Sequence, residues 1–189
     1  MVLGKALNRL IYTSIYQLGE TVKRSTAFLG AFAPRVQGNI AAKNTVEEIN
    51  ADIVRRVIEE VWNGENPTSV NELYAPLFHW HSGAGAVTYL PEKWLSAPDS
   101  QLQAIRHSFP DLQITIEKIV VTGDTAADCY SGRGSFKEVL NVKRLGGSSY
   151  VVPTGKEEYW DGVFMYRFED GKIVDEWWYW DTDFEAIIH

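Results

Sequence analysis

Residues 112–117 decide the fold, and they read Leu112-Gln113-Ile114-Thr115-Ile116-Glu117. Apolar and polar residues alternate here, and a period of two is typical of a β-strand with one buried face. Gly123-Asp124 then predicts a turn, and residues 125–138 predict the next strand. The chain after Pro110 is therefore expected to form a sheet.

The second half of that sheet is indicated by Glu169-Asp170-Gly171-Lys172. Glycine accepts a positive φ in a tight turn, so this sequence predicts a hairpin between strands 156–168 and 172–180. A Gly/Ser-rich excursion that ends at Gly155 precedes the hairpin. The order of these strands predicts an antiparallel meander.

Upstream of Pro110 the apolar period is that of helices. Thr45 and Glu48 have the spacing of a capping box, in which hydroxyl and carboxylate satisfy unpaired amides, and this predicts a helix over 46–61. Residues 91–109 predict a further helical stretch, interrupted or kinked at Pro98, whereas 77–81 predict a short strand. Helices followed by an antiparallel meander indicate the α+β class.

Charge divides the 189-residue chain near residue 40. Residues 1–43 contain six Lys/Arg against Glu20 alone, whereas the remaining residues contain 12 Lys/Arg and 24 Asp/Glu. An acidic body disfavours nucleic-acid binding, which needs a basic face. We expect an N-terminal extension over 1–43 and one domain over 44–189.

The extension carries a helical apolar stripe made of Leu3, Leu7, Leu10, Ile11, Ile15, Leu18 and Val22. We expect this helix to dock on the body or on a second subunit. Weak attachment to a membrane surface is the alternative, because the polar face of the helix is basic.

Asp181 is the first candidate for chemistry. Strand alternation places Ile173, Asp175, Trp177, Tyr179 and Asp181 on one face, so this carboxylate follows two large aromatic rings. Loss of hydration beside such rings raises a carboxyl pKa and favours a general base. The alternative is that Asp181 only caps a terminal helix.

His79 and His81 lie two residues apart and therefore share a face of their strand. We expect a polar spot in a cavity there rather than a metal site, because a third ligand is not evident. The single cysteine, Cys129, excludes an internal disulfide and is expected to be a small buried hydrophobe.

These parts occur in the order found in the SnoaL-like polyketide cyclase family of the nuclear transport factor 2-like superfamily, which residues 44–187 resemble. The resemblance is carried by Glu59-Glu60-Val61-Trp62-Asn63-Gly64, Leu73-Tyr74-Ala75-Pro76, His81, Phe109-Pro110-Asp111-Leu112, Thr122-Gly123-Asp124, Pro153-Thr154-Gly155-Lys156, Phe168-Glu169-Asp170-Gly171-Lys172-Ile173, Trp177 and Asp181.

The resemblance implies an α+β fold, a cone-shaped barrel made of a curved antiparallel sheet, which is wrapped by N-terminal helices and surrounds an apolar pocket. It also implies that Asp181 removes a proton next to a carbonyl, that the carbanion closes an aldol ring, and that His81 assists. His79, Trp177 and Tyr179 are expected to line the same space. The family often has His where this chain has Glu176.

We therefore expect a cofactor-free cyclase or isomerase, with no metal, that acts on a hydrophobic polyketide- or terpenoid-like compound, as a cytoplasmic homodimer. One alternative is a hydrolase or dehydratase of the same fold, acting on an epoxide or lactone. Another is a non-catalytic small-molecule-binding module, which a pocket plugged by aromatic side chains would indicate.

Overall fold

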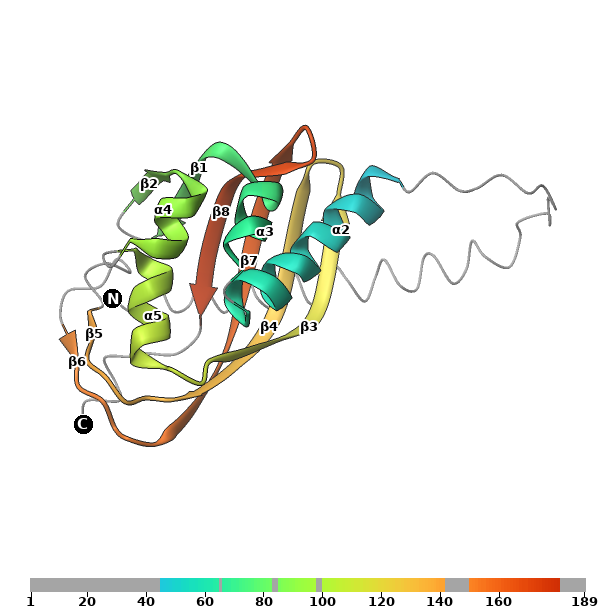
Figure 1. Cartoon of the computed structure of the whole chain (residues 1–189). Helices are drawn as coiled ribbons and strands as arrows, with labels where there is room; N and C mark the ends of the chain where they lie inside the picture. Colours follow the sequence, from blue (N-terminus) through green and yellow to red (C-terminus); the bar gives the residue numbers. More distant parts are fainter. Residues whose placement is uncertain (1–44, 65, 83–84, 98–99, 142–149, 181–189) are drawn as a thin grey trace, which may run out of the picture.

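The structure is a computed structural model and describes residues 45–180, apart from 65, 83–84, 98–99 and 142–149 (Figure 1). The predicted N-terminal extension over 1–43 and the predicted helix after Asp181 lie outside the described residues. The described residues belong to the body that the sequence places in the α+β class.

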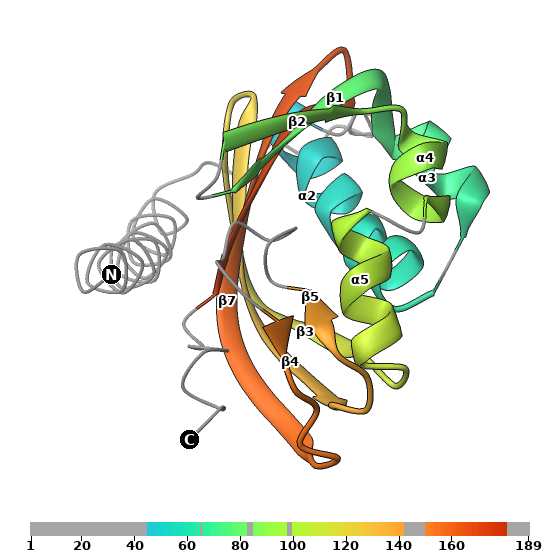
Figure 2. The same ribbon diagram turned by 90° about the vertical axis from the view of Figure 1, so that its left-hand side faces the viewer.

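One curved six-stranded sheet forms the frame of this body, and its strand order is β2-β1-β8-β7-β4-β3. The strands are β1 (Tyr74–Ser82), β2 (Gly85–Tyr89), β3 (Gln113–Thr122), β4 (Thr125–Ser135), β7 (Glu157–Glu169) and β8 (Lys172–Trp180). All neighbours are antiparallel except β1 and β8, which pair in parallel. The sheet bends strongly without closing (Figure 2), which confirms the predicted curved sheet and leaves β2 and β3 as edges.

All the described helices cover the concave face of this sheet (Figure 2). They are α2 (Val46–Arg56), the π-helical turn η1 (Val57–Trp62), α3 (Pro67–Leu73), α4 (Pro91–Ser96) and α5 (Gln101–Ser108). The predicted helical stretch over 91–109 is two helices, α4 and α5, which confirms the interruption that the proline in this stretch predicts, since proline cannot donate the backbone hydrogen bond of a continuous helix. The core lies between these helices and the sheet.

Helix α2 begins as the sequence predicts. Thr45 accepts from the backbone of Glu48 while the Glu48 carboxylate accepts from the Thr45 amide, so the capping box is formed. The helix then widens into η1, and Asn63 comes directly after it. The Asn63 side chain exchanges two hydrogen bonds of 2.8 and 2.9 Å with the backbone of Ile114, which fixes η1 to β3.

The β7–β8 hairpin also matches its sequence signal. Asp170 and Gly171 have φ of 49° and 71°, the left-handed conformation that the turn requires. Within the predicted excursion, β5 (Leu140–Asn141) pairs with β6 (Tyr150–Val151).

The two faces of β8 carry different chemistry. Asp175, Trp177 and Tyr179 face away from the helices, whereas Glu176 and Trp178 face the core, as strand alternation predicts. The prediction for Ile173 is wrong: it is fully buried in the helix-covered core. The pairing with β7 shifts between Arg167 and Phe168, so one extra residue in β8 inverts the alternation.

Candidate functional site

The helix-covered face of the sheet is filled by a cluster of four tryptophans, which we call the indole cluster: Trp62, Trp80, Trp94 and Trp178. The ring of Trp178 lies 4.6 Å from Trp62, 5.0 Å from Trp80 and 6.1 Å from Trp94, between ring centroids. All four side chains are at most 7% exposed. Aromatic contacts of this kind add to the stability that area burial alone supplies.

Glu176 is a carboxyl group inside this apolar surface, and it is 0% exposed. Its Oε1 accepts from Trp178 Nε1 at 2.7 Å, and its Oε2 accepts from the Tyr74 hydroxyl at 3.0 Å. Burial raises the pKa of Glu176 to about 7, although the two hydrogen bonds oppose that change. A carboxyl with this pKa both accepts and returns protons near neutral pH.

Asp128 is a second buried carboxyl on the same face. It is 0% exposed, its Oδ1 lies 3.3 Å from the backbone amide of Phe164, and its Oδ2 lies 3.5 Å from the Tyr166 hydroxyl. Burial is the largest cause that raises its pKa well above the usual range, and the charge of Glu176 adds to it. Tyr166 pairs across the strands with Glu176, so this phenol lies between the two carboxyls.

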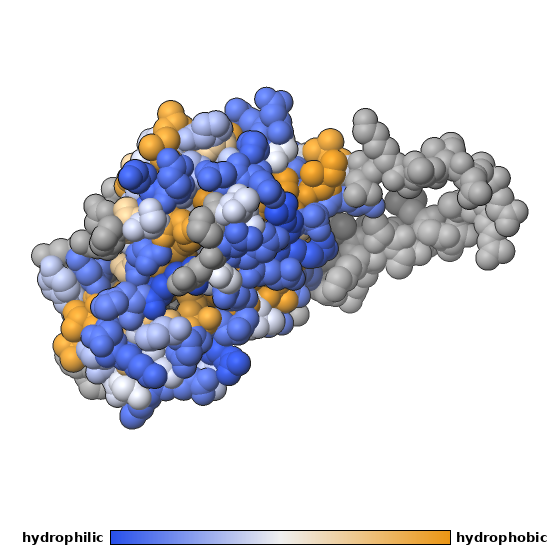
Figure 3. Space-filling view, in the orientation of Figure 1, coloured by the Kyte–Doolittle hydropathy of each residue, from blue (hydrophilic) through white to orange (hydrophobic). Residues whose placement is uncertain are grey.

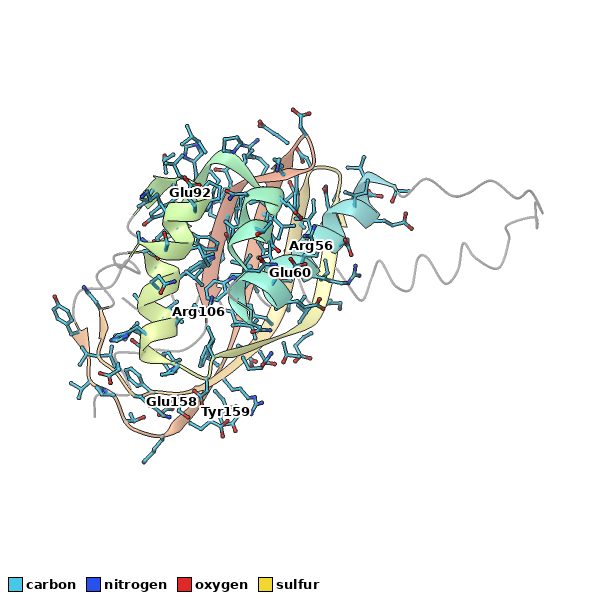
Figure 4. The ribbon with its side chains drawn as sticks, in the orientation of Figure 1. Arg56, Glu60, Glu92, Arg106, Glu158 and Tyr159 are labelled. Atoms are coloured by element: carbon cyan, nitrogen blue, oxygen red, sulfur yellow. The ribbon has the colours of Figure 1, made fainter. Side chains whose placement is uncertain are left out.

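A narrow apolar crevice adjoins the indole cluster, and it has room for about one water molecule. It is lined by Trp62, Ile105, Phe109, Leu112, Ile114, Tyr130, Trp160 and Phe164. Arg106 of α5 reaches across to η1, where it donates to the Val61 carbonyl at 3.0 Å (Figure 4). Figure 3 views the surface from the helix side, where patches of hydrophobic residues lie between hydrophilic ones.

Two glycines shape the wall of this crevice. A Cβ on Gly132 would lie 2.4 Å from the Trp160 ring, and one on Gly162 would lie 2.4 Å from the Tyr130 hydroxyl. Both approaches are closer than any side chain permits. Glycine at these positions therefore lets the rings of Trp160 and Tyr130 lie flat against neighbouring strands.

The opposite face of the sheet holds most of the predicted site residues. His81 Nε2 and Asp175 Oδ1 lie 2.6 Å apart, and the His81 ring stacks on Trp177 at 4.4 Å. Asp175 also accepts from Arg167 Nε at 2.8 Å. Burial alone would raise the pKa of Asp175, but the hydrogen bonds from His81 and Arg167 hold that pKa below its usual value. The pair resembles a base held by an orienting carboxylate.

The structure therefore brings some predicted residues together and not others. His81 and Trp177 are in contact, and the His79 ring lies 6.3 Å from His81, where His79 Nδ1 is 3.0 Å from the Thr88 hydroxyl. Tyr179 lies farther along the same face of β8, in contact with the small cluster of Ala127, Cys129 and Val163. This face is not the one the helices cover. Asp181 lies outside the described residues, and the roles of all five stay predictions.

Glu176 and Asp128 were missed as site candidates, although the sequence carries a signal for both. Each is a carboxylate on a strand face whose neighbouring residues are apolar: Asp128 alternates with Ala126 and Tyr130, and Glu176 alternates with Val174 and Trp178. An acid on the apolar face of a central strand is rarely tolerated without a hydrogen-bond partner. Cys129 is buried and free, which confirms its predicted role.

Neither a metal cluster nor a membrane span is found in the part of the chain that the structure describes. Within residues 45–180, less the gaps named above, no group of three or more His, Cys, Asp or Glu is arranged to hold a metal ion. No helix among the same residues is long and apolar enough to cross a membrane.

Comparison with known proteins agrees with this architecture. A protein from Jannaschia sp. CCS1 assigned to the SnoaL-like polyketide cyclases superposes with a TM-score of 0.60 at 19% identity, over 78% of this chain and 94% of that one. AclR from Streptomyces galilaeus, assigned as a hydroxylase, gives 0.57 at 20% identity, over 76% and 96%. These two likenesses show the fold.

IdmH from Streptomyces antibioticus, assigned as a polyketide cyclase, gives a TM-score of 0.52 at 27% identity, over 69% of this chain and 91% of that one. No curated protein matches the sequence. The sequence profile described as SnoaL-like polyketide cyclase matches residues 52–183, which is more than half of the chain. The chain belongs to the SnoaL-like polyketide cyclase family.

Proposed function

We propose that this protein is a cofactor-free acid–base enzyme, a cyclase or isomerase that acts on a hydrophobic polyketide- or terpenoid-like compound. Membership of the family supports an enzyme of this kind at the family level. The observation that carries the proposal is the Glu176 carboxyl, which is fully buried among aromatic rings and has a pKa of about 7. A desolvated carboxylate is a strong base toward an acidic C–H bond.

The reaction needs no group outside this chain and its substrate. Glu176 takes a proton from the carbon next to a ketone, and the electron pair of that C–H bond moves into the enolate oxygen. The enolate carbon then forms a C–C bond with a second carbonyl carbon, whose oxygen becomes an alkoxide. The protonated Glu176 returns its proton to that alkoxide, which regenerates the carboxylate.

Tyr74 and Trp178 position the base in this scheme. Each carboxyl oxygen accepts one of their hydrogen bonds, and because the carboxyl is fully buried, a substrate reaches Glu176 only when a neighbouring side chain moves aside. A ring-closing reaction also requires a folded substrate, and apolar walls that hold two carbonyls close together supply that orientation.

Asp181 is the competing base. It directly follows β8, and the family resemblance assigns it proton abstraction with assistance from His81. His79, Trp177 and Tyr179 belong to that same proposal. Glu176 and Asp181 lead to different results in one experiment, so the two assignments are separable.

A second candidate function is a non-catalytic binding module, and one observation favours it. The concave face is filled by the indole cluster and by Phe164, whose ring stacks 5.1 Å from Trp62. A pocket occupied by its own aromatic side chains is what a protein that only binds or assembles would show. This function predicts no proton transfer with any ketone.

The test is the exchange of the acidic C1 protons of 2-tetralone for deuterium, followed by NMR in D2O at pD 8. The full-length protein should accelerate exchange over buffer, and Glu176→Gln should lower that acceleration by about 10²-fold or more. Glu157→Gln removes an exposed glutamate of β7 and should leave the rate unchanged.

Three outcomes contradict parts of the proposal. If Asp181→Asn abolishes exchange while Glu176→Gln retains it, Asp181 is the base. If the wild-type protein never exceeds buffer while it binds 2-tetralone, the binding-module function replaces the enzyme. If His81→Ala abolishes exchange while Glu176→Gln retains it, the outer face of the sheet holds the chemistry.

A further inference from the structure

The outer face of the sheet carries a patch of apolar side chains, which we call the outer patch. Strand pairing sets its residues in two rows across β4, β7 and β8: Ala127, Met165 and Trp177 in one row, and Cys129, Val163 and Tyr179 in the other. None of the helices in the described part of the chain lies over these rows, since those helices cover the concave face (Figure 2).

The centre of the outer patch is as buried as the core. Cys129 is 0% exposed and Val163 is 1% exposed, whereas Tyr159, four residues earlier on the same face of β7, is 67% exposed. The larger side chains around them are partly buried. Soluble proteins rarely leave a contiguous apolar patch open to water, so this patch indicates a contact with another segment or another chain.

The surroundings of the outer patch favour a basic partner. Asp161 borders the patch on β7, and its strand partner Ser131 donates to the exposed Glu117 at 2.8 Å. At the opposite border Arg167 is already paired with Asp175. Beyond residue 43 the chain contains 24 Asp/Glu against 12 Lys/Arg, and a partner of complementary charge is preferred at such a surface.

Residues 3–22 supply a partner of this chemistry within the same chain. Their apolar stripe of leucine, isoleucine and valine has helical spacing, and the basic residues Lys5 and Arg9 lie off the stripe. Most of the stability of such a helix comes from packing of its apolar face. The stripe therefore needs an apolar surface, and the outer patch needs a cover.

The position where the described chain begins allows this contact. Helix α2 starts after Thr45 at the end of the sheet where β3 turns into β4, and Asn50 of this helix donates to the Gly123 carbonyl of that turn at 3.0 Å. Residues 23–44 span about 70 Å when extended, which is more than the chain needs to pass around this end of the sheet.

We propose that residues 3–22 form an amphipathic helix whose apolar stripe docks on the outer patch, over Cys129 and Met165, and that residues 23–44 connect this helix to α2 around the β3–β4 end of the sheet. The inference does not depend on the proposed function, because the outer patch lies on the opposite face of the sheet from Glu176.

The single cysteine reports directly on this cover. Burial raises the pKa of the Cys129 thiol to about 11, so little reactive thiolate is present at pH 8. The test measures the rate at which the full-length protein reacts with the thiol reagent dithiobis-nitrobenzoate. Leu10→Asp places a charge on the stripe and should raise this rate about tenfold or more. Thr13→Asp changes a residue off the stripe, and this matched control should keep the wild-type rate.

Methionine methyl groups give a second readout, because the chain contains only Met1 and Met165. In protein labelled with ¹³C-methyl methionine, Met165→Leu assigns the two signals. The Met165 signal should shift in Leu10→Asp and stay in place in Thr13→Asp. Ile15→Asp is a second stripe variant and should behave as Leu10→Asp does in both measurements. Unchanged fluorescence of the buried tryptophans verifies that the body of each variant is folded.

Wild-type thiol rates together with an unmoved Met165 signal in both stripe variants would overturn the proposal. A thiol rate that rises on dilution of the wild type and is unaffected by Leu10→Asp would also overturn it, because a second copy of the chain would then be the cover. Recovery of the wild type with phosphatidylserine vesicles, with no effect of Leu10→Asp on the thiol rate or the Met165 signal, would assign the stripe to a membrane surface instead. A shifted Met165 signal at an unchanged thiol rate supports docking, with the patch's own side chains shielding Cys129.

Discussion

Tyr74 and Glu176 are 102 residues apart in the sequence, and the Tyr74 hydroxyl donates to the Glu176 carboxyl at 3.0 Å in the structure. Tyr74 is the first residue of β1, and Glu176 lies in β8, the strand that pairs with β1 in parallel. The hydrogen bond therefore crosses the one parallel contact of the six-stranded sheet. It joins the residue that comes after helix α3 to the buried carboxyl that we propose as the base.

Removal of this donor should raise the pKa of Glu176. Tyr74→Phe deletes a hydrogen bond that favours the ionised carboxylate, and hydrogen bonds to charged groups contribute about 1.5–3 kcal/mol. We expect the pKa to rise by about one unit or more. A ¹³C NMR titration of side-chain-labelled glutamate measures it, and Tyr89→Phe, whose hydroxyl bonds Gln101, is the control. An unchanged pKa in Tyr74→Phe would contradict the hydrogen bond.

Stability should fall as pH rises through neutrality. Glu176 has a folded pKa of about 7, above its unfolded value, so between pH 5 and pH 8 the folded state binds more protons than the unfolded state. The free energy of unfolding should therefore drop by about 3 kcal/mol over that range. Asp128 acts in the same direction. Urea unfolding at several pH values measures the slope.

Glu176→Gln tests whether the titration of Glu176 causes this fall in the free energy of unfolding with pH. The amide keeps the shape of the side chain but does not titrate, so the variant should lose most of the decline and should be more stable than the wild type at pH 8. The titration of Asp128 should leave a smaller decline of the free energy of unfolding with pH in this variant. The same decline in both proteins would show that Glu176 does not titrate near neutral pH.

Gly162→Ala should destabilise the protein by about 1–3 kcal/mol, or more. The new Cβ would lie 2.4 Å from the Tyr130 hydroxyl and 2.5 Å from the Tyr179 carbonyl oxygen. The carbonyl oxygen belongs to the backbone of β8, so a change of side-chain rotamer cannot relieve this contact. Gly134→Ala, where the nearest atom is the Phe109 Cβ at 3.1 Å, should cost less. Equal stability of Gly162→Ala and the wild type, measured by urea unfolding, would contradict the close packing of β4, β7 and β8.

On the outer face, Asp175→Asn should cost about 1 kcal/mol at pH 7. The pKa of Asp175 is lowered, so its ion pairs contribute stability above its unfolded pKa, and this contribution is lost as pH falls through the folded pKa. The difference between wild type and variant should therefore shrink below about pH 4, the usual range of an aspartate pKa. The rate of 2-tetralone exchange should not change. A variant that loses exchange would assign the chemistry to this face.

The sequence predicted the α+β class, the capping box at Thr45 and the β7–β8 hairpin, because each depends on local periodicity or turn chemistry. It did not predict the parallel pairing of β1 with β8, which joins strands from opposite ends of the domain. The prediction of which sheet face Ile173 occupies was also wrong, because an extra residue in a strand cannot be recognised from the alternation of apolar and polar residues.

The candidate site was harder to predict than the fold. Alternation correctly separated Glu176 from Trp177, but it cannot say which of the two faces the helices cover. The sequence pattern pointed to the histidines and to Asp181, whereas the buried carboxyls of Glu176 and Asp128 depend on a core assembled from α4, η1, β1 and β8. Burial is a tertiary property, and the pKa of a carboxyl depends on it.

The most direct test of this account is the pH profile of 2-tetralone exchange by the wild-type protein and by Glu176→Gln. A base whose pKa is about 7 predicts a rate that rises with pH, levels off above an inflection near pH 7, and falls to the buffer rate in Glu176→Gln. An inflection near the ordinary carboxyl pKa of about 4.3, or a profile that persists in Glu176→Gln and disappears in Asp181→Asn, would contradict the assignment of Glu176 as the base.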